Sequence, residues 1–293
     1  MRAIVLLACA LPLLLGAAAP FEIVGEATLF APGIASTDYA EVRLTISPDG
    51  RTALWFSRDR PGGAGGYDIW MSRRTMTGWG TAEPVPFNTP GRDFDPAFSA
   101  DGRVVYFCSD RPGGMGGDDL YRVAVTAVGF GAVDSLGAPN SAGNEFAPML
   151  SPDGKTLLFS SDRPGGAGRH DLYVAARTGA GFAPATPLAG AINTAGDEFD
   201  ATFLSDGTTI VFARAGDFRT DRVDLFHASA RGGRYDAGTP LPGSVNSGAE
   251  GKGGSYGAML DWSRPASLAF SARRPGAKGM DLYTVAYRLE QGS

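Results

Sequence analysis

The chain has 293 residues, a formal net charge of -5, 43% hydrophobic and 19% charged residues. These values exclude a disordered tail, a coiled coil and a strongly basic nucleic-acid binder, so we expect a globular chain without a nucleic-acid partner. The 42 glycines and 20 prolines predict many short elements joined by turns. They lack the strict triplet period of collagen.

The N-terminal residues have the order of a secretory signal peptide. A single arginine precedes an unbroken apolar stretch, residues 3–15, and small residues follow it. We expect cleavage after Ala18, which makes residues 1–18 the signal peptide and residues 19–293 a single domain in the periplasm or outside the cell. The apolar stretch is too short to span a bilayer, so no membrane span is expected.

One short phrase recurs along the chain and sets the expected fold. It is found four times, as Ser47-Pro48-Asp49-Gly50, Ser99-Ala100-Asp101-Gly102, Ser151-Pro152-Asp153-Gly154 and Leu204-Ser205-Asp206-Gly207. The Asp-Gly pairs are 52, 52 and 53 residues apart. Each is followed by a β-rich run ending in Phe, a Gly-rich loop and a second apolar run opened by Asp. A fifth, degenerate copy keeps only the two apolar runs, at 268–270 and 281–283.

Each repeat unit predicts four strands, with residues 79–87 and 182–188 as examples of the fourth. A fixed period of about 50 residues with four strands per unit is typical of a β-propeller. Five copies therefore predict an all-β, five-bladed propeller with four antiparallel strands per blade. Residues 22–33 are similar to the fourth strands, so we expect the N-terminal strand to complete the last blade and leave no open sheet edge.

The repeat resembles a known family. Ser-Pro-Asp-Gly is followed by Phe-Ser-Ser-Asp-Arg-Pro-Gly-Gly-Ala-Gly at 159–168 and by Asp-Leu-Tyr at 171–173, phrases similar to the PD40 (WD40-like) propeller repeat of TolB-like exported proteins. The resemblance extends through all five copies. It implies an exported binding module, whose partner we expect to be an envelope protein, a peptide or a glycan. We expect a monomer without a cofactor.

Four carboxylates stand at one repeated position, eight residues before each repeated aspartate: Glu41, Asp93, Glu145 and Glu198. Ser255 is the expected occupant in the fifth repeat. We expect these carboxylates near one mouth of the central channel, where they would either bind a cation, a basic peptide or a metal, or hold the blade crossovers by accepting backbone and Arg hydrogen bonds. The sequence leaves both roles open.

Two positions further on, the residues differ between repeats: Arg43, Asp95, Ala147, Asp200 and Gly257. Variation at matched positions is where an individual function would be encoded. We therefore expect Arg43, Asp95 and Asp200 to contact a ligand, and their neutralisation to change binding with little change in melting temperature.

An enzymatic alternative is a glycoside hydrolase or lyase that uses carboxylates of the innermost strands. Its candidate acid and base come from one set of residues: Asp93, Asp95, Glu145, Glu198 and Asp200. The sequence assigns no catalytic residue among them. Finding the carboxylates around an open pocket would favour hydrolysis, whereas a plugged channel would favour a binding scaffold.

Four further features have modest structural interpretations. The Asp-Arg-Pro-Gly-Gly loops lack the density of oxygen ligands of a calcium loop, so we expect turns capped by Asp and tied by an Arg–carboxylate pair. His170 and His227 are expected to be surface residues rather than metal ligands. Cys108, the only cysteine of the mature chain, is expected to be buried and unreactive. Residues 213–217 depart from the loop motif, so we expect a different loop there.

Overall fold

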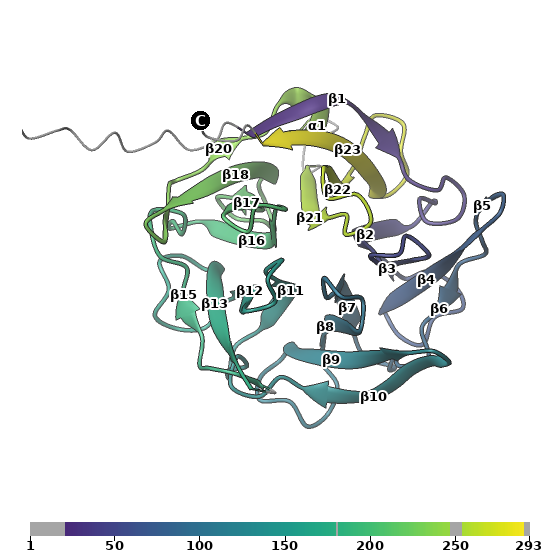
Figure 1. Cartoon of the computed structure of the whole chain (residues 1–293), viewed down its shortest axis with the longest axis horizontal. Coiled ribbons are helices and arrows are strands. Elements are labelled where there is room, and N and C mark those ends of the chain that lie inside the picture. The colour runs from purple at the N-terminus through teal and green to yellow at the C-terminus, as the bar shows by residue number, and fades with distance from the viewer. Residues whose placement is uncertain (1–20, 180, 247–253, 290–293) are drawn as a thin grey trace, which may run out of the picture.

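In the computed structural model, the residues described are 21–179, 181–246 and 254–289. Their strands form five antiparallel sheets arranged around a central axis, with β2, β7, β11, β16 and β21 innermost (Figure 1). The five-bladed propeller predicted from the repeat is therefore confirmed. The expected signal peptide, residues 1–18, lies outside the described residues. Within those residues no helix has the length and apolar character needed to cross a membrane.

The blades follow one another along the chain. Blade one contains β2 (Ala40–Ile46), β3 (Thr52–Arg58), β4 (Tyr67–Thr75), β5 (Gly78–Trp79) and β6 (Glu83–Pro84). Blade two contains β7 (Asp93–Phe98), β8 (Val104–Ser109), β9 (Asp119–Thr126) and β10 (Gly129–Ser135). Blade three contains β11 (Glu145–Leu150), β12 (Thr156–Ser161), β13 (Asp171–Thr178), β14 (Gly181–Phe182) and β15 (Thr186–Pro187).

The last two blades complete the circle. Blade four contains β16 (Asp197–Phe203), β17 (Thr209–Ala215), β18 (Asp224–Arg231), β19 (Arg234–Tyr235) and β20 (Thr239–Pro240). A single helical turn, α1 (Gly243–Asn246), follows. Blade five contains β21 (Ser255–Leu260), β22 (Ser267–Ala272), β23 (Asp281–Leu289) and the N-terminal β1 (Phe21–Leu29).

The N-terminal strand closes the propeller, as predicted. β1 pairs antiparallel with β23, so that Phe21 lies opposite Leu289 and Leu29 lies opposite Tyr283. The sheet order is β1-β23-β22-β21, which places the two ends of the described chain in one blade. This pairing removes the open edge that the third strand of blade five would otherwise expose.

The outermost strands differ from the prediction in three blades. Continuous strands were expected at 79–87 and 182–188, but blades one, three and four each have two short pieces that pair separately with the third strand. In each of these blades the second piece contains a proline, at Pro84, Pro187 or Pro240. Proline cannot donate to a ladder, which restricts it to edge positions and shortens the pairing there.

The repeated Ser-x-Asp-Gly phrase forms the turn between the first two strands of a blade. In blade one the Ser47 hydroxyl donates to an Asp49 carboxylate oxygen at 2.6 Å, and that oxygen accepts the Arg51 N–H at 3.0 Å. Gly50 adopts a φ of 70°, a conformation that favours glycine. The Asp-Gly pair recurs in blades one to four because this turn joins the first two strands there; in blade five, Asp261 accepts the Ser263 N–H at 2.9 Å instead.

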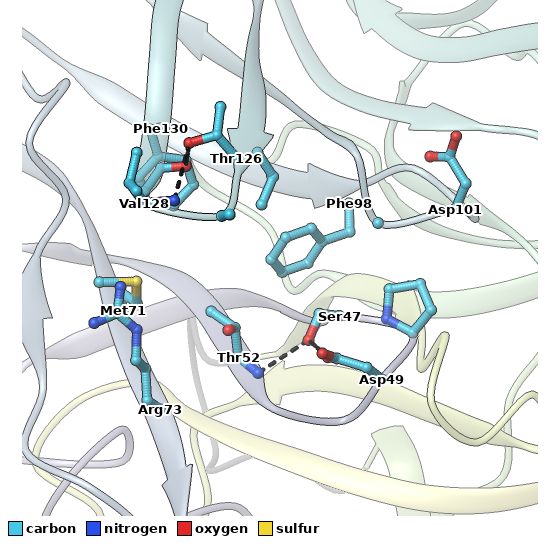
Figure 2. A pocket seen from close by; sticks show the side chains of 15 residues that line it. Ser47, Asp49, Thr52, Met71, Arg73, Phe98, Asp101, Thr126, Val128 and Phe130 are labelled. Atoms are coloured by element: carbon cyan, nitrogen blue, oxygen red, sulfur yellow. Dashed lines mark hydrogen bonds between the residues drawn. The ribbon is translucent and has the colours of Figure 1, made fainter.

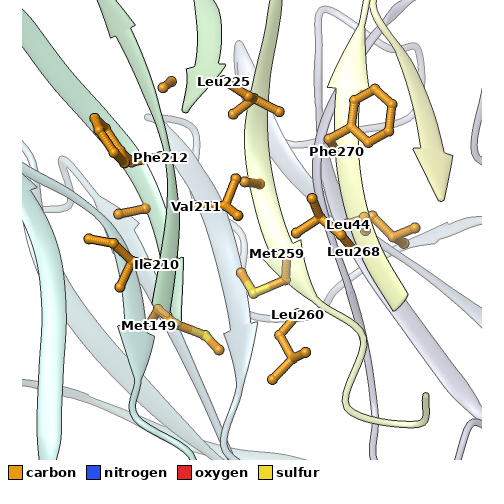
Figure 3. Close-up of a cluster of buried hydrophobic side chains, with 14 of the residues drawn as sticks. Leu44, Met149, Ile210, Val211, Phe212, Leu225, Met259, Leu260, Leu268 and Phe270 are labelled. Atoms are coloured by element: carbon orange, nitrogen blue, oxygen red, sulfur yellow. The ribbon is translucent and has the colours of Figure 1, made fainter. Parts of the chain in front are cut away.

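The hydrophobic core lies between neighbouring blades rather than within one sheet. Figure 3 shows Met149 of blade three beside Ile210 and Val211 of blade four and Met259 of blade five, all buried. Each sheet therefore depends on its neighbours for burial of its faces. Cys108 is fully buried in blade two, as expected, and burial raises the pKa of its thiol.

Candidate functional site

Each innermost strand has a β-bulge at the same place, which we call the bulge position. The five residues have positive φ angles: Arg43 (59°), Asp95 (52°), Ala147 (56°), Asp200 (50°) and Gly257 (65°). Register shifts in the strand pairs accompany all five. A non-glycine residue in this region costs roughly 1 kcal/mol or more, and bulges often redirect a side chain next to a site. The side chains at the bulge positions are therefore candidates for a site in the central channel.

The side chain of Arg43 closes the channel. It is fully buried, and its guanidinium donates to the carbonyl oxygens of Ala147 at 3.0 Å and of Pro148 at 3.3 Å, both in blade three. Further bonds of 3.3 Å reach the carbonyls of Ala201 in blade four and Ala258 in blade five. Arg43 starts from blade one, so this side chain crosses the channel and ties four blades together.

The carboxylates of Asp95 and Asp200 accompany Arg43. They are 3% and 5% exposed, and each accepts a backbone N–H from the next bulge position, Ala147 at 3.0 Å and Gly257 at 2.9 Å. Burial raises the pKa of both groups; the charge of Asp200 raises that of Asp95 further, while Arg43 lowers both. When both are ionised, two negative charges face one positive charge.

A cavity of about 450 Å³ opens above these carboxylates, at the end of the channel where the innermost strands begin; we call it the cup. Its floor contains Asp95 and Asp200. The residues just before the bulge positions line its lower wall: Val42, Phe94, Phe146, Phe199 and Tyr256. Its upper wall and rim contain Ala40, Phe56, Arg58, Tyr67, Arg92, Asp118, Asn144, Asp162, His170, Phe218, Arg219, Val223 and Gly254.

Aromatic rings form two arcs of the cup wall. Phe56, Tyr67 and Phe94 of blades one and two pack together, with ring centroids 5.6–5.8 Å apart. The second arc runs from blade three to blade five through Phe146, His170, Phe218, Phe199 and Tyr256, with centroid distances of 5.2–6.5 Å. The cup therefore has an apolar aromatic wall above an acidic floor.

His170 contradicts the expectation of a surface histidine. Its side chain is buried in the cup wall, and its Nδ1 lies 2.7 Å from an oxygen of Asp197. Burial raises the pKa of Asp197, but hydrogen bonds from His170, the Phe218 N–H and Arg169 outweigh it and hold that pKa below its ordinary value. His227 is also partly buried, against Phe21 of β1, and burial lowers its pKa.

The loop at 216–222 forms a lip of the cup. As its missing Asp and Pro predicted, it differs from the loops of the other blades. Its cap is Asp221, which accepts the Asp217 N–H at 2.8 Å, and not Asp224, the residue that opens the third strand. The Phe218 N–H donates to Asp197 at 2.9 Å, which fixes the lip to the His170–Asp197 pair. The Phe218 ring, 39% exposed, lines the cup.

The four carboxylates of the repeated position, which we call the strand-start carboxylates, lie elsewhere. Glu145 is fully buried and accepts hydrogen bonds from the Ser141 N–H at 2.9 Å, the Ser141 hydroxyl at 2.5 Å and the Ser161 hydroxyl at 2.8 Å. Arg163 approaches it at 3.0 Å and stacks over Tyr173, 4.8 Å from the ring centroid. None of the four lines the cup.

Blades two and four repeat this pattern, blade one has a looser version of it, and blade five has Ser255 in place of a carboxylate. Arg111 lies 2.6 Å from Asp93, and Arg214 lies 2.7 Å from Glu198. In blade one the Arg60–Glu41 distance is 3.9 Å. Burial raises the pKa of Glu41 to about 7, since its bonds from Thr37 and the more distant Arg60 only partly offset the loss of solvent.

The Gly-rich loops are Asp-capped turns, as expected. In blade two an oxygen of Asp119 accepts the N–H groups of Met115 at 2.7 Å and Gly116 at 3.2 Å. A Cβ on Gly114 would lie 1.9 Å from that oxygen, which explains the glycine. Across the three described stretches, no group of three or more His, Cys, Asp or Glu side chains is placed to hold a metal ion.

Larger cavities lie at the opposite ends of the innermost strands. Figure 2 shows one of about 570 Å³ between blades one and two, where Ser47, Asp49 and Thr52 bond one another beside Phe98. A similar cavity of about 610 Å³ lies between blades three and four, around Asp153. Both are lined by the repeated turns, so we attribute them to the splay of neighbouring blades. The cup instead combines a repeated aromatic position in its lower wall with floor and rim residues that differ from blade to blade.

The sequence prediction found part of this site. Asp95 and Asp200 line the cup, and Arg43 lies beneath its floor, so the structure brings these three together. The aromatic wall and His170 were missed. A signal existed, because the residue before the Asp that opens each third strand also varies between repeats: Tyr67, Asp118, His170, Val223 and Met280. The first four line the cup.

Comparisons with known proteins identify the fold. No family model matches the chain, and no curated protein matches it in sequence. Among solved structures, TolB from Acinetobacter baumannii matches with a TM-score of 0.51 and 15% identity, over 86% of this chain and 56% of TolB. The present chain thus spans little more than half of that protein.

Two carbohydrate-active enzymes have similar folds. The arabinanase of Bacillus subtilis matches with a TM-score of 0.56 and 12% identity, over 85% of this chain and 95% of the enzyme. The α-L-arabinofuranosidase of Lactobacillus brevis matches with a TM-score of 0.54 and 11% identity, over 88% of this chain and 92% of the enzyme. At such identities these likenesses show the propeller fold alone.

Proposed function

We propose that this chain is an exported binding module that holds its ligand in the cup, and that the ligand belongs to an envelope protein, a peptide or a glycan. The observation that carries the proposal is the cup: about 450 Å³, walled by aromatic rings and closed beneath by Arg43. Sites of this kind, apolar with a few convergent polar groups, bind small ligands or a protruding part of a larger one. The signal-like N-terminus and the repeat's resemblance to exported proteins support a periplasmic or secreted location.

The surroundings of the carboxylates support binding rather than hydrolysis. A glycoside hydrolase needs two carboxyl groups that reach the scissile bond from either side. Asp95 and Asp200 are almost fully buried, and each already accepts a backbone N–H. The other three carboxylates of the hydrolase alternative, Asp93, Glu145 and Glu198, are engaged outside the cup.

The test is capture of a ligand from envelope extracts by the purified mature chain. Ala40→Trp would place a large ring in the cup, whereas Val128→Trp would place the same ring at a fully exposed turn on the other side of the molecule. We expect the wild type and Val128→Trp to retain the same ligand and Ala40→Trp to lose it, with similar melting temperatures. Equal retention by all three proteins would overturn the proposal.

A direct assay separates the hydrolase alternative. Arabino-oligosaccharides and other glycans incubated with the wild type are expected to remain intact, whether or not they bind. Sustained cleavage that Asp95→Asn or Asp200→Asn abolishes would replace the binding proposal with a hydrolase.

A further inference from the structure

We propose that the group seated in the cup is an alkylammonium cation, a positively charged nitrogen bearing apolar carbons. This inference rests on the proposed function and names the chemistry of its ligand. Three features of the cup support it: the carboxylates of the floor, the aromatic side chains of the walls and the ion pairs of the rim arginines.

The floor holds two buried carboxyl groups, Asp95 and Asp200, next to a single guanidinium, Arg43. Asp95 and Asp200 share one cation, Arg43, which is bonded to four carbonyl groups beneath them. A net charge held away from water is costly, and a group in this position either takes up a proton or attracts a counter-charge. The raised pKa values of both aspartates agree with this imbalance. A cation in the cup would restore neutrality above the floor.

The walls suit a cation with apolar substituents better than a hydrated metal ion. Phe94 and Phe146 line the cup from the adjoining blades two and three, and Phe199 and Tyr256 continue its wall in blades four and five. The faces of such rings attract ammonium groups through their quadrupoles, most strongly when the cation is desolvated. The same rings would pack against methyl or methylene groups. The aromatic wall offers few oxygen ligands to a metal.

The positive charges of the rim are largely paired. Arg92 lies 2.9 Å from Asp118 and 3.3 Å from Asp110, and Arg58 lies 3.2 Å from Asp59. Arg219 is an exposed residue over the Phe218 ring. Its repulsion acts through water, where charges interact far more weakly than in a buried site. The carboxylates of the floor therefore determine that the preferred ligand is positively charged.

The test compares choline with dimethylbutanol, its uncharged carbon isostere, by NMR or calorimetric titration of the mature chain. We expect choline to bind at least tenfold more tightly, since the two probes differ in charge and hardly in shape. A short peptide with one lysine and its norleucine counterpart then separate a peptide side chain from a free small cation. Equal binding of the charged and uncharged members in both pairs, or binding of neither charged probe, would overturn the inference.

Three variants assign any binding to the cup. Asp200→Asn removes one floor charge and is expected to weaken the cation about tenfold, leaving the uncharged probe unchanged. Phe146→Leu keeps the bulk but loses the ring face and should weaken the cation several-fold; it also serves if Asp200→Asn does not fold. Phe130→Leu, at the cavity of Figure 2, is the control and should change nothing.

The outcomes distinguish this inference from the proposed function. If Ala40→Trp abolishes capture of an envelope ligand but charged and uncharged probes bind alike, the cup is a binding site for another class of ligand and only the cation inference fails. If Ala40→Trp leaves capture unchanged, the proposed function fails as well.

Discussion

Glu198 and Asp200 stand two residues apart on β16, yet their surroundings differ in almost every respect. Glu198 points into the blade crossover, where it accepts the Thr194 N–H at 2.7 Å and pairs with Arg214 at 2.7 Å. Asp200 sits on the bulge, has a positive φ and forms part of the cup floor. The first arrangement recurs in four blades. The second does not, and we take this contrast between repeated and individual residues as the division between scaffold and site.

The same contrast holds around the propeller. The strand-start carboxylates are held by serine or threonine, backbone N–H groups and an arginine stacked on aromatic rings. The bulge positions carry an arginine, two aspartates, an alanine and a glycine. Conserving geometry while varying chemistry at the bulge lets one scaffold carry a specific site.

The largest effect is expected for Arg43→Gln. The sequence alone suggested that neutralising this residue would leave the melting temperature almost unchanged, but its burial and four carbonyl bonds change that expectation. Arg43 is the cation whose charge lowers the pKa of both Asp95 and Asp200, and its removal should cost about 5 kcal/mol, the upper end of the range for removing one partner of a buried ion pair. Urea unfolding measures this cost. A loss below about 1 kcal/mol would place Arg43 among the ligand contacts instead.

A smaller but clear loss is expected for Glu145→Ala. The change deprives Arg163 of its partner and leaves the Ser141 N–H without an acceptor, which should cost about 3 kcal/mol. Glu145→Gln keeps an acceptor and should cost about 1–2 kcal/mol. Chemical denaturation of both variants checks the order. Unchanged stability of Glu145→Ala would contradict a structural role for the strand-start carboxylates.

The ionisation of Glu41 should make the stability of the protein depend on pH. Its pKa in the folded state, about 7, lies above the ordinary 4.5, so ionisation opposes folding. The penalty is absent below pH 4.5, grows as the pH rises to about 7 and is constant above that. Relative to the wild type, Glu41→Gln should therefore gain about 3 kcal/mol between pH 4.5 and 8. A pH-independent difference in unfolding free energy would contradict this account.

The smallest effect is expected in the reactivity of Cys108. Cys108 is buried and lies opposite Phe94 in the pairing of β7 with β8, where the next residue, Ser109, lies opposite Asp93. Labelling of the thiol therefore reports local opening of blade two. We expect slow labelling of the wild type and of Asp200→Asn. Asp93→Asn, which weakens the pair with Arg111, should speed labelling several-fold. Rapid labelling of the native wild type would show that the site is not closed.

The sequence was sufficient to predict the blade count and the closure of the last blade, because the apolar runs recur in all five blades and residues 22–33 are similar to the fourth strands. Ser47, Asp49 and Gly50 form a turn with one another, so the pattern that makes the turn can be recognised in the sequence alone. The split of the outer strands was missed because Pro84 and Pro187 shorten the hydrogen-bonded pairing with the third strand, and that pairing cannot be recognised in the sequence.

The site was harder to predict because it forms where five blades converge. Arg43 was identified as variable, but its carbonyl partners belong to residues more than 100 positions away. His170 looked isolated in the sequence, although the fold places it against Asp197 and between Phe146 and Phe218. Variation at matched repeat positions pointed to residues that lie at the floor of the cup. Only the packing of the blades shows which side chains face the cup.

The most direct test of the division between scaffold and site is a parallel measurement on Glu198→Gln and Asp200→Asn, which make the same chemical change on one strand. Each variant is assayed for unfolding free energy and for retention of the envelope ligand. We predict that Glu198→Gln loses about 1–2 kcal/mol and binds normally, whereas Asp200→Asn stays within about 1 kcal/mol of the wild type and loses the ligand. Loss of the ligand by a stable Glu198→Gln, with Asp200→Asn unfolded or binding normally, would contradict the account.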